Sequence, residues 1–488
     1  MLETDYKPTI GLEIHCELKT NSKMFCSCKN DPNEKEPNKN ICPICSGHPG
    51  TLPTINQEAV QKVIKAGLSL NCEIAHDSKF DRKNYFYPDL PKGYQISQYD
   101  QPLCQNGYIV IDGNKIRIKR IHLEEDTGRI QHDKDSSLID YNRAGMPLME
   151  LVTEPDIFNA QLAKKFGQEL QLIFRYLGIS DADMEKGQMR VEVNISLSKT
   201  NELGTKVEVK NISSFNFVAM AIDYEITRQA EILDRGEKIV QETRGWDSIK
   251  NITVSQRIKE GESDYRYFPE PDLPPLKISQ EEIREIESQI PELPQAKRDR
   301  FIGEYNLTDK EIEVFIIDKQ ISEYFEKICS ELMAWAQDEK LEQDYLKMAK
   351  LAANYILTDY RGIYVAKGID DKDYPITPEN FAELVKMIYK GEISSKIAKI
   401  VLLEMFETKG DPSTIIKEKG LEQISDSSQI ESIAKIVVEK NSKAVADYKK
   451  GQVNSAQFLV GQLMKESKGA ASPEIAKEII NKILSEIE

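Results

Sequence analysis

Hydrophobic and polar residues alternate with a period of two along several segments of residues 1–280. From Ile10 to Leu18, every second residue is apolar, and Glu13, His15 and Glu17 lie among the residues between them. Because successive side chains of a strand point to opposite faces, this pattern predicts a half-buried strand with those three side chains on its other face. The same pattern predicts strands over 108–118, with a hairpin turn at Asp112-Gly113, over 189–197 and over 207–209.

Apolar residues three and four positions apart predict helices between these strands and almost throughout the chain beyond Ser279. Two of the earlier helices are followed directly by glycine, which a helix C-cap favours. The predicted helices are 56–70, 159–177 before Gly178, 215–235 before Gly236, and, in the later part, 379–389, 395–407 and 473–487.

Together these patterns predict an α+β protein in three parts. A proline-rich passage over 267–275 ends the strand-rich part, and a break at 410–412 divides the helical part. We therefore predict a strand-rich body over 1–290, a helical domain over 291–410 and a small helical tail over 411–488.

The composition narrows the class of protein. Among 488 residues there are 81 Asp and Glu against 65 Lys and Arg, a net charge of −16, which argues against binding nucleic acid by bulk positive charge. Residues 281–345 hold 18 acidic and 8 basic residues, so most of the excess lies in the helical connector and leaves room for a local RNA-binding surface. No apolar run reaches the roughly 20 residues of a membrane helix, and no signal peptide is visible. We expect a cytoplasmic protein with no membrane partner.

Four cysteines form two close pairs, Cys26 with Cys28 and Cys42 with Cys45. In a reducing compartment such pairs bind metal more often than they form disulfides. Two pairs on separate turns can supply four thiolates in the tetrahedral arrangement that structural zinc favours. We predict a zinc knuckle between Cys26 and Cys45, with reduced surface thiols as the alternative and His48 as a candidate to replace one thiolate.

Three acidic groups are candidates for a cation site: Glu13 with His15, the run Glu124-Glu125-Asp126, and Glu150. Glu150 lies in an apolar run, where a carboxylate is costly to bury unless it is paired or bound to a metal. Carboxylates that converge on one face would suit Mg²⁺, which takes oxygen ligands and usually brings a bound phosphate. Solvated strand ends and ion pairs with nearby arginines are the alternative interpretation.

Basic and aromatic residues alternate closely over 79–94, a segment that includes Lys83 and Lys92. Such alternation is typical of sites that hold phosphates or stacked bases, although an aromatic loop packed on a sheet would look the same. Neither a Walker A loop nor a kinase glycine-rich loop is present. The residues by themselves predict a body that binds a metal and phosphates and carries a zinc knuckle.

Several longer motifs are spread over nearly the whole chain. They are IGLEIH at 10–15, DRKNYFYPDLPKGYQISQ at 81–98, HLEEDTG at 122–128, NRAG at 142–145, ELVTEPD at 150–156, DYRYFPEPD at 264–272 and FLVGQ at 458–462. At these stretches the chain closely resembles the B subunit of the aspartyl/glutamyl-tRNA amidotransferase, the GatB family. The length and the three-part organisation agree with the resemblance.

The resemblance implies a kinase-like cradle domain, an all-α domain and a helical tail that binds tRNA. It also implies an ATP-dependent ligase component that acts in a heterotrimer with an amidase (A) subunit and a small (C) subunit. Such a complex converts Glu-tRNA(Gln) to Gln-tRNA(Gln), or Asp-tRNA(Asn) to Asn-tRNA(Asn). The B subunit uses ATP and Mg²⁺ to phosphorylate the side-chain carboxylate of the misacylated tRNA, and ammonia channelled from the amidase displaces the phosphate.

The resemblance also implies roles for particular residues. It makes His15, Glu125 and Glu150 the expected Mg²⁺ and phosphate site, with Glu13 and Glu124 beside it. The cysteine pairs match one branch of the family, so the expected zinc is structural.

Lys83 and Lys92 match positions near the mouth of the family's ammonia channel, where Glu125 is also expected to accept a proton from ammonium. The chain departs from the family pattern at Glu192, where many relatives have a shorter acid, and at 452–455, a stretch that is commonly more basic. A non-catalytic RNA-binding scaffold is the main rival hypothesis. A zinc hydrolase is disfavoured because four thiolates leave no open coordination position.

Overall fold

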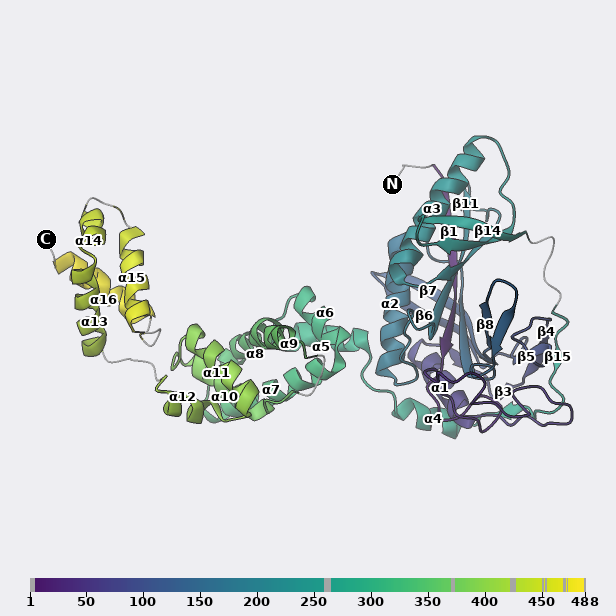
Figure 1. The fold of residues 1–488 in the computed structure, drawn as a ribbon, viewed down its shortest axis with the longest axis horizontal. Coiled ribbons are helices and arrows are strands. Elements are labelled where there is room, and N and C mark those ends of the chain that lie inside the picture. Colours follow the sequence, from purple (N-terminus) through teal and green to yellow (C-terminus); the bar gives the residue numbers. More distant parts are fainter. Residues whose placement is uncertain are drawn as a thin grey trace. The chain divides into compact units, whose positions relative to one another are not determined.

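Figure 1 shows the fold of the chain in a computed structural model, which describes residues 5–258, 265–369, 374–421, 427–449, 452, 454–467, 471 and 473–486. Asp264, the first residue of one motif, lies outside these residues. The chain divides into two compact units, Met1–Pro294 and Gln295–Glu488. The first contains a large mixed sheet and the second is helical, so the predicted α+β class is confirmed. The predicted borders at 290 and 410 stay predictions.

A nine-stranded sheet forms the centre of the first unit, in the order β14-β13-β12-β11-β1-β10-β7-β6-β2. Neighbouring strands are antiparallel except β12 and β13, which are parallel. All the strands predicted from alternation are present, including the hairpin at Asp112-Gly113. The strands of this sheet are β1 (Lys7–Glu17), β2 (Glu73–Ile74), β6 (Cys104–Ile111), β7 (Asn114–Glu125), β10 (Pro147–Thr153), β11 (Met189–Ser198), β12 (Val207–Ile212), β13 (Glu242–Asp247) and β14 (Ile252–Ile258).

Helices cover one face of this sheet, with α2 and α3 along one side of it in Figure 1. The buried residues Ile10, Leu12 and Ile14 of β1 belong to one hydrophobic core with residues of these helices, such as Phe166 and Ile222. The predicted early helices are therefore confirmed. They are α1 (Gln57–Ser69), α2 (Ala160–Tyr176) and α3 (Phe215–Asp234), followed by α4 (Gln280–Ser288); Asn56, Asn159 and Ser214 cap α1 to α3, and Gly178 and Gly236 have positive φ.

Short strands lie on the other side of the sheet in Figure 1. Three of them form a small sheet, in which Arg82 of one strand contacts residues at the other two. Its guanidinium donates to Glu270 at 2.6 and 2.8 Å and lies 4.3 Å from the ring centre of Tyr94. This small sheet brings the basic and aromatic segment beside the end of β7. Its strands are β4 (Asp81–Asn84), β5 (Tyr94–Ser97) and β15 (Phe268–Pro269), and the remaining pairs are β3 (Asp77–Ser78) with β16 (Leu276–Lys277) and β8 (Arg129–His132) with β9 (Ser137–Asp140).

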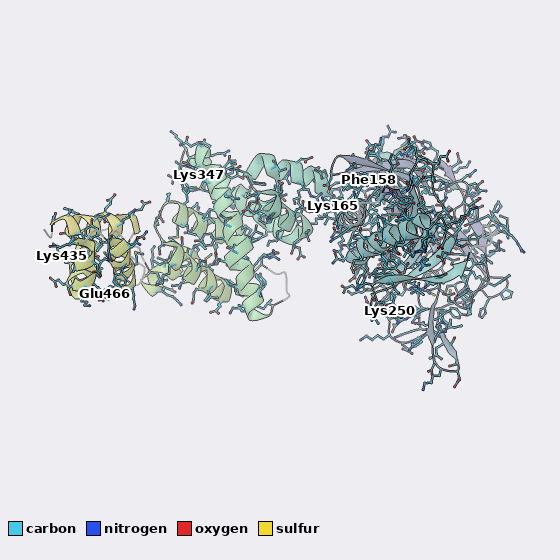
Figure 2. All side chains as sticks on the ribbon, turned by 90° about the horizontal axis from the view of Figure 1, so that it is seen from above. Phe158, Lys165, Lys250, Lys347, Lys435 and Glu466 are labelled. Atoms are coloured by element: carbon cyan, nitrogen blue, oxygen red, sulfur yellow. The ribbon has the colours of Figure 1, made fainter. Side chains whose placement is uncertain are left out.

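The second unit is built from amphipathic helices around aromatic and aliphatic cores. The rings of Phe315 and Phe325 stack at 4.5 Å, and Ile430, Leu459 and Ile480 are fully buried in a core of the tail. Charged side chains such as Lys435 and Glu466 lie on the tail's surface (Figure 2). The later helices predicted from spacing correspond to α10, α11 and α16 and are confirmed. The helices are α5 (Pro294–Tyr305), α6 (Asp309–Ile317), α7 (Lys319–Asp338), α8 (Tyr345–Tyr355), α9 (Arg361–Lys367), α10 (Pro378–Tyr389), α11 (Ser395–Thr408), α12 (Pro412–Lys419), α13 (Ser427–Lys440), α14 (Ser442–Lys449), α15 (Asn454–Glu466) and α16 (Pro473–Glu486). Among the described residues, no helix combines the length and the apolar character needed to cross a bilayer.

Gly67 marks a close contact between α1 and the sheet. A Cβ at this position would lie 2.5 Å from Cys104 Sγ and 3.0 Å from Ile74 Cδ1. Gly67→Ala is therefore expected to lower the thermal midpoint of the first unit, since overpacking a core costs about 1–3 kcal/mol. Calorimetry checks this, with Gly303→Ala in α5 as the control, because no atom lies within 4 Å of that Cβ position and alanine favours helix by about 1 kcal/mol. An unchanged midpoint for Gly67→Ala would contradict the packing.

Candidate functional site

The polar face of the nine-stranded sheet lines a cleft of about 1120 Å³. Strand register arranges the candidate residues in a row, with His15 of β1 opposite Glu150 of β10, which in turn is opposite His122 of β7. Glu13 of β1 is opposite Glu192 of β11 in the same way. Because directly opposed residues have Cβ atoms about 5 Å apart, the strands bring these side chains together without the help of a loop.

Nε2 of His15 is the atom around which the carboxylates gather. It lies 3.5 Å from Glu150, 3.7 Å from Glu124 and 3.9 Å from Glu13. Nε2 of His122 lies 3.3 Å from the Glu150 oxygen that also faces His15. Three groups of side chains in the cleft have ligand atoms within 4.8 Å of one another: Glu13 with His15 and Glu150, His122 with Glu124 and Glu150, and Glu13 with Glu192 and Glu208.

Burial and neighbouring charges shift the pKa values of His15 and Glu150 in opposite directions. Burial favours the neutral form of His15, but its hydrogen bond to Glu150 and the charges of Glu150 and Glu124 outweigh this effect and raise its pKa to about 9. Burial would raise the pKa of Glu150, whereas His122 and His15 hold it well below its usual range. The negative charge that holds a proton on His15 would equally attract a metal cation.

Glu125 does not join this cluster. Both oxygens of its carboxylate accept hydrogen bonds from Nζ of Lys92, and one also accepts from the backbone N–H of Ile96 at 2.9 Å. Successive residues of a strand face opposite sides, so only one residue of the pair Glu124 and Glu125 can share a face with His122. The structure brings Glu124, rather than Glu125, into the group with His15 and Glu150.

Cationic side chains line the same cleft beside the carboxylates. Nζ of Lys83 lies 4.0 Å from Glu124 and 5.3 Å from the ring centre of Tyr265, and the charges of Glu124 and Glu150 raise the lysine's pKa against the effect of burial. Arg120 approaches Glu150 at 3.7 Å. The cleft therefore offers carboxylates that could bind a cation. It also offers ammonium and guanidinium groups that could bind the phosphate oxygens accompanying that cation.

Several residues of the cleft were missed by sequence reasoning. His122 and Arg120 alternate with Glu124 along β7, beyond the end predicted for this strand at Ile118, so extending the period-two pattern would have found them. Arg190, which donates to Asp126 at 3.0 Å, is a polar position of the predicted strand over 189–197 and carried the same signal. Tyr99, whose ring stacks on that of Tyr267 at 4.1 Å, has no such signal because tertiary packing brings it in.

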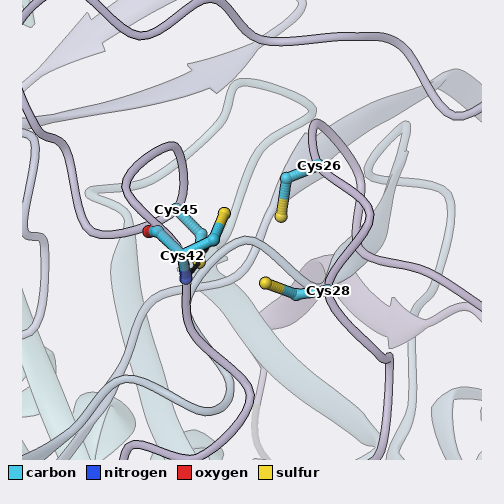
Figure 3. Close-up of side chains that lie close together, drawn as sticks. All are labelled: Cys26, Cys28, Cys42 and Cys45. Carbon is cyan, nitrogen blue, oxygen red and sulfur yellow. Dashed lines mark hydrogen bonds between the residues drawn. The ribbon is translucent and has the colours of Figure 1, made fainter.

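The four predicted cysteines meet in one cluster. Figure 3 shows Cys26 and Cys28 on one loop facing Cys42 and Cys45 on the next, and their sulfur atoms all lie within 4.8 Å of one another. All four thiols are free, and His48 is not among the grouped residues. A hydrogen bond from Cys26 lowers the pKa of Cys45 to about 4, which favours the metal-binding thiolate. The cluster could hold a metal ion such as zinc.

Comparison with known proteins identifies the class to which this fold and site belong. The GatB/GatE catalytic domain matches residues 8–284, and a further GatB domain matches residues 338–484. The sheet with its cleft is therefore a catalytic domain of the GatB/GatE type.

Full-length relatives narrow the class to one family. Three proteins, each named as the B subunit of an aspartyl/glutamyl-tRNA(Asn/Gln) amidotransferase, are similar along almost their whole length. That of Thermotoga maritima is 47% identical over 491 residues, covering 98% of this chain and 99% of that protein; that of Persephonella marina is 49% identical over 486 residues (98% and 100%); and that of Dehalococcoides mccartyi is 48% identical over 496 residues (99% and 100%). The chain belongs to the GatB family, the B subunits of aspartyl/glutamyl-tRNA amidotransferases. This confirms the predicted family and the predicted class of enzyme, a tRNA amidotransferase of the ligase type.

The cysteine cluster generates a prediction about metal and stability. Purified protein is expected to contain zinc, and Cys45→Ser is expected to lose it and to unfold at a lower temperature, because a structural metal contributes to folding free energy. Metal analysis by mass spectrometry together with calorimetry checks both effects. Cys72→Ser is the control, since this buried cysteine lies outside the cluster. The Cys72→Ser protein should keep its zinc. Full zinc content in Cys45→Ser would contradict the assignment.

Proposed function

We propose that the chain uses ATP and Mg²⁺ to phosphorylate the side-chain carboxylate of Glu-tRNA(Gln), of Asp-tRNA(Asn), or of both. Ammonia released by an amidase (A) subunit then displaces the phosphate, in a heterotrimer that also contains a small (C) subunit. The observation that carries this proposal is the group of His15, Glu124 and Glu150, which lines a cleft beside Lys83. The family to which the chain belongs supports the choice of misacylated tRNA as the substrate.

The residues of the cluster fit a magnesium ion. Glu150 and Glu124 supply carboxylate oxygens, which Mg²⁺ prefers, while the open cleft leaves room for the waters that it usually keeps. Glu125 was the expected third ligand, but its carboxylate is engaged by Lys92, so the position of Glu124 supports Glu124 in that role. Bound here, Mg²⁺ would neutralise charge on the transferred phosphoryl group.

The chain's own side chains account for the remaining requirements of phosphoryl transfer. This reaction depends on positioning and charge neutralisation, and Lys83 and Arg120 present positive charge beside the carboxylates. A carboxylate is a poor electrophile, whereas an acyl phosphate reacts readily with ammonia. Ammonium must first lose a proton, and we assign this step to Glu125, once Lys92 moves away from it.

The tail is proposed to contact tRNA. Residues 441–488 hold 7 Lys and 6 Asp or Glu and are therefore nearly neutral, so the contact must be local. Phe458 is half exposed beside Lys440 and Lys443 and offers an apolar and basic surface of this kind. The cytoplasmic location stays a prediction.

Variants of the carboxylates test the proposed site in a complex reconstituted with the amidase and the small partner. Glu150→Gln and Glu124→Gln are expected to lower ATP-dependent amidation of misacylated tRNA by about a hundredfold or more, because a positioned charge of this kind contributes several kcal/mol to the transition state. Glutamine hydrolysis by the amidase should survive. Glu125→Gln is expected to impair amidation while Mn²⁺, used in place of Mg²⁺, still binds with unchanged affinity.

Glu73→Gln, an exposed carboxylate on β2 of the same sheet, is the control and should remain fully active. Full amidation by Glu150→Gln would support a non-catalytic scaffold and contradict the proposed site. Loss of Mn²⁺ binding in Glu125→Gln would restore Glu125 as a ligand.

Truncation tests the role of the tail. Removing the chain from Asn441 onward is expected to weaken binding of misacylated tRNA by about tenfold, or 1.4 kcal/mol, while leaving ATP binding unchanged, because the proposed cation site lies wholly in the first unit. Binding assays with each ligand measure the two affinities. Equal tRNA affinity for the truncated and full chains would refute the proposal.

A further inference from the structure

Lys23 is a fully buried lysine beside the cysteine cluster. Its side chain has no solvent exposure, and Nζ donates to the carbonyl oxygens of Ala144 at 2.7 Å and Tyr141 at 3.2 Å. The same Nζ lies 3.7 Å from Sγ of Cys45. One buried ammonium group therefore links the 141–145 turn to the cluster.

The charge of Lys23 requires a balancing anion. A buried ammonium group costs several kcal/mol unless an opposite charge lies near it. Among the described residues, no carboxylate lies within ion-pairing distance of Lys23, and its side-chain contacts are two carbonyls and the Cys45 sulfur. The sulfur is the only one of these three contacts that can carry a full negative charge.

A metal-loaded cluster has the opposite imbalance. Four thiolates around a divalent ion carry two net negative charges, and the cluster lies largely within the protein, with Cys26 and Cys45 buried. Within the cluster, the backbone N–H of Cys42 donates a hydrogen bond to Cys45 Sγ at 3.2 Å, which offsets part of this negative charge. The ammonium group of Lys23 places a full positive charge beside the same sulfur.

Two glycines connect the surroundings of the cluster to the Lys92–Glu125 pair. A Cβ at Gly145, whose φ is +84°, would lie 3.3 Å from Cys45 Cβ and 3.7 Å from Glu125 Oε2. A Cβ at Gly47 would lie 2.8 Å from Lys92 Cγ. At Gly47 any larger residue would have to displace Lys92, and Gly145 leaves little free space between Cys45 and Glu125. A shift of the cluster would therefore be passed to the pair through these two glycines.

We propose that Lys23 is a positioning residue that balances the charge of the metal–thiolate cluster and fixes the 141–145 turn between Cys45 and Glu125. Metal binding at the cysteines thereby sets the place of the Lys92–Glu125 pair. This inference rests on zinc binding by the four cysteines and is independent of the chemistry proposed for the cleft.

Zinc transfer from the full-length chain to a colorimetric chelator tests the charge. Lys23→Met removes the ammonium but keeps a side chain of similar length, and it is expected to release zinc about tenfold faster or more, as the loss of a partner of a metal ligand typically causes. Lys23→Arg keeps the charge and should remain within about threefold of the wild type. Lys29→Met is the control, because Lys29 follows Cys28 directly and is exposed, with Asp31 as its partner at 2.7 Å.

Cobalt in place of zinc separates this electrostatic role from a general loss of stability. A positive charge beside a thiolate lowers the energy of the sulfur's electrons. Removing the Lys23 ammonium in Lys23→Met should therefore shift the sulfur-to-cobalt charge-transfer band to longer wavelength. Lys23→Arg and Lys29→Met should keep the wild-type band. An unshifted band together with wild-type zinc release in Lys23→Met would overturn the inference, whereas wild-type protein without zinc would overturn the zinc site itself.

A measurement on the wild type covers the case in which Lys23→Met fails to fold. With metal bound, Lys23 and Lys92 should resist acylation of their amines, and chelation should raise the modification of both about fivefold or more relative to Lys29, as local opening exposes them. Mass spectrometry of the peptides measures each site. Equal modification of Lys23 and Lys92 with and without metal would overturn the proposed link.

Discussion

The register of β1, β10 and β7 is the constraint on which the site depends. His15, Glu150 and His122 meet because they are direct cross-strand partners, and a slip of one residue would turn Glu150 into the core and Leu151 into the cleft. The apolar residues between them, such as Ile14 and Leu151, resist this slip because they are buried against the helices. The hydrophobic core therefore holds the cluster of charges in place.

The buried carboxylates of the cleft have polar or cationic partners. Two histidines face the buried carboxylate of Glu150, and behind this group Asp126 is held between Arg190 and Arg143. A buried carboxylate without such partners would become protonated or destabilise the fold. A region so rich in paired charges suits the divalent ion and the phosphate proposed for this cleft, because that ligand also carries charges of both signs.

Local signals in the sequence predicted much of the fold. Alternation fixed β1 and the β6–β7 hairpin, and glycine after α2 and α3 marked their ends, because each of these features depends on neighbours in the chain. The choice between Glu124 and Glu125 required strand parity with His122. Lys23 could not be found in this way, since a lysine in an irregular segment is expected in solvent, and its partners in the 141–145 turn and at Cys45 are distant in the sequence.

The cleft and the Lys92–Glu125 pair differ in what holds them. The group of His15, Glu124 and Glu150 lies on strands of a broad sheet, whose backbone hydrogen bonds fix its geometry whether or not an ion is bound. Lys92 lies in a loop before β5, outside any strand, and Gly47, two residues after Cys45, lies close against it. Loops move more readily than strands, so a precise position there requires another constraint. A metal held by four thiolates would supply such a constraint, which would give a structural zinc ion a reason to lie near Glu125, the proposed proton acceptor.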